Sequence, residues 1–291
     1  MYFKTHFFSL SLYQAETMSF DLRVFLRKKH ERLPISMATA YDYPTARIEE
    51  EARIDIILVG DSVGTNVLGY ESEREVTMED MLHHLKAVVR GAPHSCIMVD
   101  FPYGSAPDPF TAFENSRRLI DAGAHIVKIE GWGEKKSITS YLAGKGMAVC
   151  SHIGYNPQYH GSKGRTFGKD AAGAIELVRS AVSLEKAGAA MLLVEKVPEE
   201  VCGIITERVS VPVIGIGSGR QCDGQVLVFH DIVGLGWRNF RHARAYETLR
   251  QRMTDALISY NSDVCSRTFP AEENMVHISE GELAEIKRSL Q

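Results

Sequence analysis

The stretch Ile54-Asp-Ile-Ile-Leu-Val-Gly-Asp61 contains a short apolar run and ends in an acidic residue. Uninterrupted runs of this length are typical of strands buried on both faces, as in parallel sheets. Seven such runs alternate with longer stretches of helical spacing, and an eighth is less regular. The seven lie at 36–42, 54–61, 95–100, 126–130, 147–152, 191–195 and 211–217, and the eighth, which could equally be a short helix, lies at 226–231.

The stretches between the runs have the spacing and the ends of helices. Residues 113–123 and 174–188 both close with a glycine where a helix is expected to stop. Seven or eight strand–helix units in one chain favour a closed α/β barrel of the TIM (β/α)8 type over an open doubly wound sheet. Because no Pro- or Ser-rich linker interrupts the pattern, we predict a single barrel domain over residues 18–291.

Segments at both ends lie outside the barrel pattern. Residues 20–30 predict a helix that caps the bottom of the barrel, and residues 246–264 and 279–291 predict a helical tail. Residues 1–17 lack the apolar centre and the cleavage site of a signal peptide, so we interpret them as an N-terminal extension before a natural start at Met18.

The composition excludes several classes of protein. Hydrophobic residues make up 44% and charged residues 24%, which is typical of a globular core rather than of disorder. The formal charge of −4 is spread along the chain without a basic stripe, so nucleic acid is not expected as a partner. No apolar run reaches the roughly 18–20 residues of a membrane helix. The five cysteines are dispersed and form no CxxC pair, which predicts reduced thiols in a cytoplasmic protein.

Polar side chains at the ends of the runs are the candidates for chemistry, because catalytic groups of TIM barrels lie at the C-terminal ends of the strands. These residues are Asp42, Asp61, Asp100, Glu130, His152 and Glu195. Carboxylates that converge in one pocket repel one another unless a cation or protons neutralise them. Oxygen ligands from a few carboxylates suit Mg²⁺ better than zinc or copper. We therefore predict a Mg²⁺ site at Asp61, Asp100 and Glu130, and interpret Asp42 as structural.

Lys128 lies two residues before Glu130, so both side chains point to the same face of their strand. If that face is the barrel interior, the lysine can bind an anionic substrate beside the metal. A structural Lys–Glu pair is the simpler alternative. A Schiff-base role, as in class I aldolases, is disfavoured because the neighbouring carboxylates would keep the amine protonated.

Glu195 and His152 complete the set of candidates. Glu195 ends the apolar run of the sixth strand, a desolvated position that suits a general base, although a salt bridge with Lys196 is an alternative. His152 could donate a hydrogen bond to a substrate oxygen or simply orient a loop.

A series of collinear motifs resembles the ketopantoate hydroxymethyltransferase family. The similarity runs from about residue 36 to residue 234, with an echo at 269–273. The motifs are Thr39-Ala-Tyr-Asp-Tyr43, Leu58-Val-Gly-Asp-Ser62, Arg90-Gly-Ala-Pro93, Asp100-Phe-Pro102, Val127-Lys-Ile-Glu-Gly131, His152-Ile-Gly154, Pro212-Val-Ile-Gly-Ile-Gly217 and Asp223-Gly-Gln-Val-Leu-Val228.

The resemblance implies a barrel of the isocitrate lyase and phosphoenolpyruvate mutase superfamily. It implies that Asp61, Asp100 and Glu130 bind Mg²⁺, that Ser62 and Lys128 join the two aspartates in binding a 2-oxo acid, and that Glu195 accepts a proton. The substrates it implies are 3-methyl-2-oxobutanoate and 5,10-methylenetetrahydrofolate. The reaction would pass through a Mg²⁺-stabilised enolate to 2-dehydropantoate, in pantothenate biosynthesis. Members of the family are commonly homo-oligomers, often decamers.

The sequence departs from the family pattern at the second half of the site. Lys196 follows the proposed base where the family has cysteine, and the loop at 156–165 is shorter than its glycine-rich counterpart. After the eighth unit the family's Pro-Lys-Phe pattern is also missing. Two alternatives therefore stay open: a paralogue that uses the same enolate chemistry on another 2-oxo acid or one-carbon donor, and a non-catalytic relative.

Overall fold

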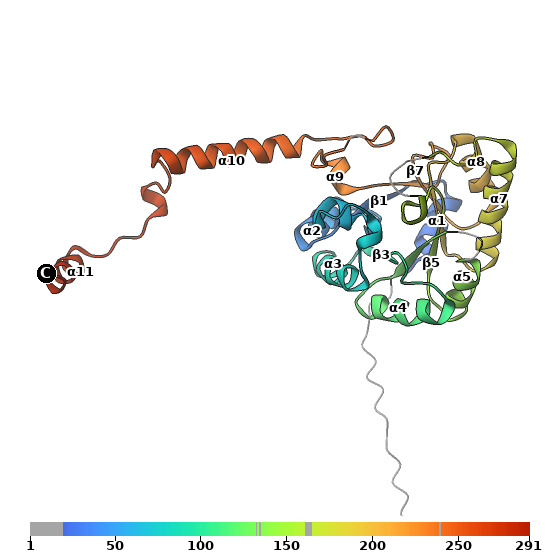
Figure 1. Ribbon diagram of the computed structural model, residues 1–291, viewed down its shortest axis with the longest axis horizontal. Helices are drawn as coiled ribbons and strands as arrows, with labels where there is room; N and C mark the ends of the chain where they lie inside the picture. The colour runs from blue at the N-terminus through green and yellow to red at the C-terminus, as the bar shows by residue number, and fades with distance from the viewer. Residues whose placement is uncertain (1–19, 132, 134, 161–164, 239) are drawn as a thin grey trace, which may run out of the picture.

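Eight parallel strands form a closed barrel in the computed structural model, which describes residues 20–131, 133, 135–160, 165–238 and 240–291. Each strand pairs with its neighbours in chain order, and the last pairs with the first (Figure 1). The predicted TIM barrel is confirmed. The strands are β1 (Ile35–Thr39), β2 (Ile56–Val59), β3 (Cys96–Asp100), β4 (Ile126–Glu130), β5 (Val149–Gly154), β6 (Met191–Glu195), β7 (Val213–Ile216) and β8 (Gly224–Leu227).

The apolar runs form strands because each strand is packed on both sides. In β2, Ile56 and Leu58 belong to the cluster inside the barrel, whereas Ile57 and Val59 belong to the cluster between the strands and the outer helices. Alternate residues of a strand point to opposite faces, so a run without polar interruptions is required here. The short helix α1 (Arg23–His30) places Phe25 in the interior cluster.

Helices that cover the barrel follow each of the first six strands (Figure 1). Four of them start at a side chain that accepts a hydrogen bond from the first turn, and one of these is Asp42, as its structural interpretation predicted. The helices are α2 (Tyr43–Glu51), α3 (Met78–Gly91), α4 (Pro109–Asp121), α5 (Lys135–Gly144), α7 (Ala171–Lys186) and α8 (Glu199–Arg208); the shorter segments are η1 (Gly64–Leu68), η2 (Glu73–Glu75) and α6 (Pro157–His160).

The last two units of the barrel differ from the first six. Only residues 217–223 connect β7 to β8, and a four-residue helix, α9 (Phe229–Ile232), follows β8. The run at 226–231 therefore contains the end of β8 and then α9, so that both readings of this run were partly right. The strand β8 needs only residues 224–227 to complete the barrel, so the rest of the run is free to form α9.

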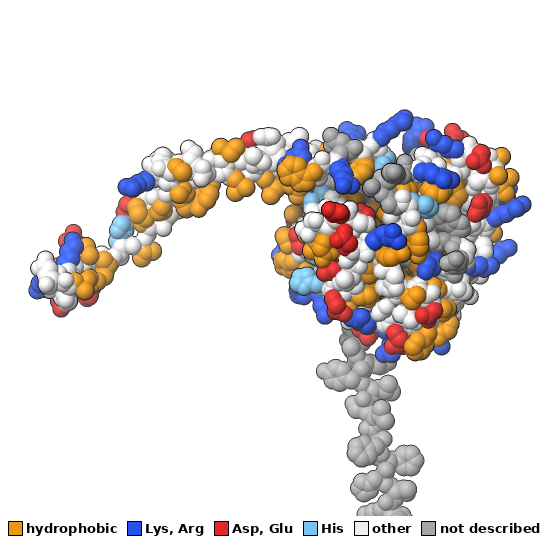
Figure 2. Space-filling view, viewed as in Figure 1, with side chains coloured by type: hydrophobic (Ala, Val, Ile, Leu, Met, Phe, Trp, Pro, Cys, Tyr) orange, Lys and Arg blue, Asp and Glu red, His pale blue; other side chains and the backbone are white. Residues whose placement is uncertain are grey.

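The C-terminal segment extends away from the barrel as an arm (Figure 1). It contains α10 (Leu249–Ser266), η3 (Glu272–Asn274) and α11 (Glu280–Ser289), the helical tail expected from the sequence, and no residue of these helices is buried. Hydrophobic side chains gather along the arm (Figure 2). Within the described ranges, no helix combines the length and the apolar character needed to cross a membrane. The proposed extension at 1–17 lies outside the described residues.

Candidate active site

Three acidic side chains and one lysine are buried together where β2, β3 and β4 end. Asp61, Asp100, Lys128 and Glu130 are each no more than 4% exposed. We call these four residues the acidic cluster. Three carboxylates against one ammonium leave this buried group with a formal charge of −2 if all four are ionised.

Lys128 is the cationic centre of the acidic cluster. Its Nζ lies 3.0 Å from Oδ1 of Asp100 and 3.5 Å from Oε1 of Glu130. Although burial opposes a charge on the amine, the coulombic attraction of Asp100, Glu130 and Asp61 outweighs it and raises the pKa of Lys128. The lysine is therefore protonated, as the sequence predicted, and a charged amine is a poor Schiff-base nucleophile.

The carboxyl groups of the acidic cluster respond differently to burial. Burial raises the pKa of Asp61, and the nearby charges of Asp100 and Glu130 raise it further. Burial also raises the pKa of Asp100, in spite of Lys128. For Glu130, Lys128 and His152 overcome the effect of burial and lower the pKa to about 2. The surrounding protein thus stabilises the charged form of Glu130, whereas the charged forms of Asp61 and Asp100 lack enough nearby positive charge.

The ends of β2 and β3 are joined through the backbone. The N–H of Asp61 donates to Oδ2 of Asp100 at 3.0 Å. A Cβ at Gly60 would come within 2.9 Å of Oγ of Ser62 and 3.5 Å of Oδ2 of Asp100, so glycine leaves room for this close approach. The motif Gly60-Asp61-Ser62 is therefore shaped to bring the two aspartates together.

Gln158 is a part of the site that sequence reasoning missed. It lies in α6, after β5, and is 4% exposed. Its Nε2 donates to Oδ2 of Asp61 and to the carbonyl oxygen of Phe101, both at 2.8 Å, and its backbone N–H donates to Oε2 of Glu130 at 3.2 Å. Its place in the loop after a barrel strand marks the region of the site but does not single out this residue.

His152 lies between the acidic cluster and Glu195. Its Nδ1 is 3.3 Å from Oε1 of Glu130, and its Nε2 is 3.5 Å from Oε2 of Glu195. Burial and Lys128 disfavour a charged ring, but the two carboxylates more than offset them and raise the pKa of His152. The predicted proton acceptor is thus separated from the predicted metal ligands by one imidazole.

Glu195 also contacts its neighbour in sequence. Nζ of Lys196 lies 3.7 Å from Oε1 of Glu195 and 3.9 Å from the centre of the Tyr155 ring, a cation–π contact. Lys196 has a φ of 49°, in the left-handed region that few residues other than glycine adopt. The salt bridge considered as an alternative from the sequence is therefore present, and it fixes a cation beside the carboxylate.

Ser62 belongs to a chain of hydroxyl groups at the ends of β1 and β2. The hydroxyl of Thr39 donates to the hydroxyl of Tyr41 at 2.9 Å, and the latter oxygen lies 2.8 Å from Oγ of Ser62. Burial raises the pKa of Tyr41, so this phenol stays neutral and can donate to Ser62. Every predicted site residue is thus found at the same end of the barrel.

The acidic cluster is not arranged as a finished metal site. In the part of the chain that the structure describes, no three His, Cys, Asp or Glu side chains are grouped so that they could hold one ion. The carboxylates instead contact Lys128, Gln158 and His152. Sharing one ion requires Oδ1 of Asp100 and Oε1 of Glu130 to turn from Lys128 and His152 toward Asp61.

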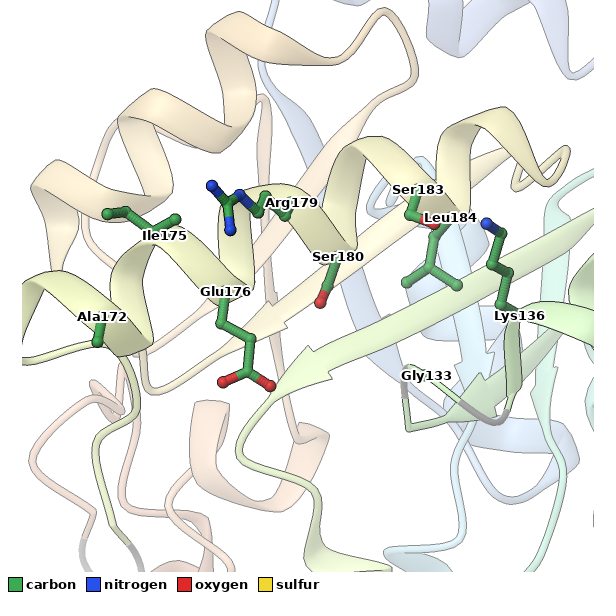
Figure 3. Close-up of a pocket in the computed structure, with 9 residues that line it drawn as sticks. All are labelled: Gly133, Lys136, Ala172, Ile175, Glu176, Arg179, Ser180, Ser183 and Leu184. Carbon is green, nitrogen blue, oxygen red and sulfur yellow. The ribbon is translucent and has the colours of Figure 1, made fainter.

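A separate open groove of about 530 Å³ lies on the outer wall of the barrel, along α7 (Figure 3). Lys136 at the start of α5 and Gly133 before it complete its lining. None of the predicted site residues lines this groove, so it is not part of the candidate site.

The model of the ketopantoate hydroxymethyltransferase family matches residues 20–272. The chain belongs to that family. A curated member from Bacillus cereus (strain B4264), named 3-methyl-2-oxobutanoate hydroxymethyltransferase, is 41% identical over 263 residues, which cover 89% of this chain and 95% of the relative. A member of the same name from Bacillus thuringiensis (strain Al Hakam) is equally similar and is covered to 94%. The resemblance proposed from the sequence motifs is confirmed.

Solved structures support the predicted type of barrel. A phosphonopyruvate hydrolase in complex with oxalate and Mg²⁺ superimposes with a TM-score of 0.59 at 11% identity, over 92% of this chain and 96% of that protein. A 2,3-dimethylmalate lyase, described as a member of the PEP mutase/isocitrate lyase superfamily, has a TM-score of 0.54 at 14% identity, over 71% of this chain and 80% of that protein. At 11% and 14% identity, these similarities show a common fold and nothing about function.

Proposed function

We propose that the chain is a 3-methyl-2-oxobutanoate hydroxymethyltransferase that uses 5,10-methylenetetrahydrofolate as the one-carbon donor and forms 2-dehydropantoate. The observation that carries this proposal is the buried acidic cluster at the ends of β2, β3 and β4, in a chain that belongs to the family. Removing a proton next to a carbonyl group needs a base and positive charge near the developing oxyanion. The cluster and Glu195 offer groups of both kinds.

The acidic cluster fits a divalent cation by charge and by type of ligand. Its formal charge of −2 would be cancelled by one Mg²⁺, and burial makes an uncancelled charge costly. The oxygen donors of Asp61, Asp100 and Glu130 are those that Mg²⁺ prefers. When bound, Mg²⁺ would supply Lewis-acid stabilisation of the enolate oxygen.

The roles of the other residues follow from their positions. The ammonium group of Lys128, beside Asp100 and Glu130, would attract the carboxylate of the 2-oxo acid, and the hydroxyl of Ser62, held by Tyr41, would orient it. Glu195 would take the proton from C3 of the substrate.

His152 would act from its position between Glu130 and Glu195. There it would keep the carboxylate of Glu195 turned toward the substrate and could donate a hydrogen bond to a substrate oxygen. The carbanionic C3 would then form a C–C bond to the one-carbon unit as the bonds of that unit to the two folate nitrogens break, with water supplying the hydroxyl oxygen and tetrahydrofolate leaving.

We also propose that the chain acts as a homo-oligomer. Its arm carries exposed apolar side chains on α10, and large exposed apolar patches mark interaction sites. These residues are Met253, Leu257, Ile258, Tyr260 and Val264, which are between 43% and 66% exposed. The short helix α9 after β8 leaves that side of the barrel without a long covering helix, where the arm of a second copy could pack. The oligomer size, the single-domain organisation and the cytoplasmic location stay predictions.

Sedimentation of the full chain tests the oligomer. We expect a species larger than one chain, and we expect Leu257→Glu together with Ile258→Glu to dissociate it while the barrel stays folded. A wild-type protein that sediments as a monomer would contradict this part of the proposal.

Proton exchange at C3 of 3-methyl-2-oxobutanoate in D₂O tests the first half of the reaction without folate. We expect exchange with Mg²⁺ and none after chelation of the metal, followed by formation of 2-dehydropantoate when 5,10-methylenetetrahydrofolate is added. Exchange without transfer to carbon would favour a paralogue that uses another one-carbon donor. Absence of exchange on every 2-oxo acid tried would contradict an enzymatic role.

A further inference from the structure

One residue of the loop after β5 contacts the ends of three other strands. Gln158 donates through Nε2 to the side chain of Asp61, which follows β2, and to the carbonyl of Phe101, which follows β3. Its backbone N–H donates to the carboxylate of Glu130, the last residue of β4. All three N–H bonds of this residue are therefore used on the strand ends that carry the proposed metal ligands.

These contacts fix the directions of the carboxylates as well as their positions. A carboxylate that accepts a hydrogen bond on one oxygen is turned so that its other oxygen points elsewhere. Gln158 holds Oδ2 of Asp61 and Oε2 of Glu130, whereas Lys128 lies on the Oε1 side of Glu130. A bond to the carbonyl of Phe101 adds a restraint directly after Asp100.

The loop around Gln158 is itself anchored. The N–H of Tyr155 donates to the carbonyl of Glu195 at 2.8 Å, and the N–H of Asn156 donates to Nδ1 of His160 at 3.1 Å. Asn156 is 2% exposed. Gln158 is therefore presented from a fixed segment that also contacts the end of β6, where the proposed base lies.

We propose that Gln158 is a positioning residue for the divalent cation: it orients Asp61 and Glu130 from outside the ligand set and links the cation site to the loop after β5. This inference rests on the proposed function, because it assumes that Asp61, Asp100 and Glu130 bind Mg²⁺. Partners that orient metal ligands are typically worth about 10- to 100-fold in metal affinity. Loss of both side-chain donors of Gln158 is thus expected to weaken Mg²⁺ binding by that factor.

Titration calorimetry with MgCl₂, without substrate, tests the proposal on the wild-type chain and on Gln158→Met and Gln158→Ala. Methionine keeps the length of the side chain and removes both N–H donors. Alanine also removes them and shortens the side chain, so that one variant remains if the other does not fold. Gln251→Leu is the matched control, because Gln251 on exposed α10 also donates from Nε2 to an aspartate at 2.8 Å. Circular dichroism establishes which variants are folded.

The expected result is a rise of about 10- to 100-fold in the Kd for Mg²⁺ in both Gln158 variants and an unchanged Kd in the control. The Mg²⁺ concentration that gives half-maximal proton exchange should rise in parallel, with much of the rate recovered at saturating Mg²⁺. Folded Gln158 variants that bind Mg²⁺ like the wild type would overturn the role of Gln158 and leave the proposed function intact. A wild-type chain that binds no Mg²⁺ would overturn both.

Discussion

Replacement of Glu195 by glutamine is the sharpest test of the proposed chemistry. The amide of glutamine has the same shape as the carboxylate, so the side chain can keep its position beside His152 and Lys196 while losing its negative charge. What the variant loses is the group that accepts a proton. General-base catalysis typically contributes about 10²- to 10⁴-fold, which corresponds to about 3–5 kcal/mol of the activation barrier.

The structure also says what this substitution should leave intact. The ring of His152 lies between Glu195 and Glu130, 3.5 Å from the first carboxylate and 3.3 Å from the second. The proposed ligands of Mg²⁺ therefore keep their own partners. We expect Glu195→Gln to bind one Mg²⁺ per chain, like the wild type, while proton exchange falls by about 10²- to 10⁴-fold.

Nuclear magnetic resonance measures the exchange, as loss of the C3 proton signal of 3-methyl-2-oxobutanoate in D₂O at saturating Mg²⁺. Glu200→Gln, on the exposed side of α8 five residues along the chain, is the control for loss of a negative charge, and its exchange rate should equal that of the wild type. An exchange rate of Glu195→Gln within a few-fold of the wild type, at normal Mg²⁺ binding, would falsify the assignment of Glu195 as the base.

Three further predictions concern titration and redox chemistry. Burial raises the pKa of Glu49 from 4.5 to about 8, so the folded chain holds the proton of this carboxyl group more tightly than the unfolded chain does. The contribution of the protonated group to the free energy of unfolding is therefore complete below pH 4.5 and is lost as the pH rises through 8. In urea unfolding, Glu49→Gln should therefore be more stable than the wild type by about 5 kcal/mol above pH 8 and no more stable at pH 4; equal curves at both pH values would refute this. Because burial raises the pKa of Asp61, Mg²⁺ should displace a proton and bind more tightly as the pH rises; a calorimetric heat that is the same in buffers of different ionisation enthalpy would contradict it. The sulfur atoms of Cys202 and Cys222 lie 3.1 Å apart, and their contact lowers the pKa of Cys222, so diamide should join them with loss of two hydrogen atoms, seen as one cross-linked peptide that is absent from Cys222→Ser.

The barrel and most of the site were predictable because they depend on local pattern. A strand packed on both faces is apolar along its length, so β2 and β3 are readable as runs. The residues that end such strands must lie at the same edge of the barrel. Asp42 was readable as a helix cap, because capping involves only the next few residues of the chain.

The role of Gln158 was not predictable in the same way. Its three bonds span 28, 57 and 97 residues of sequence, and no periodicity marks a residue that packs from a loop onto distant strand ends. The contact between Cys202 and Cys222 was missed for a similar reason. The sequence shows two dispersed cysteines, whereas the short connection from β7 to β8 brings Cys222 against α8.

The orientation of the carboxylates was the other limit. Sequence reasoning placed Asp61, Asp100 and Glu130 at one edge, but it could not determine where each carboxylate would point, because that depends on competition among nearby donors. Lys128, Gln158, His152 and the backbone N–H of Asp61 are donors that these oxygens contact in the chain alone.

The cost of the acidic cluster is itself an argument for its function. Taking like charges out of water is unfavourable, and well-packed apolar residues at such positions are often neutral or more stable than buried ion pairs. A barrel under no demand except stability would be expected to fill the ends of β2, β3 and β4 with apolar side chains, as it does further down the same strands at Leu58, Met98 and Ile126. The pKa values of Asp61 and Asp100 are raised because burial disfavours their charged forms and the chain supplies too little positive charge to offset it. Buried charged residues at strand ends are unfavourable in a core unless each charge has a partner. Where the protein does not supply such partners, a ligand is expected to bind.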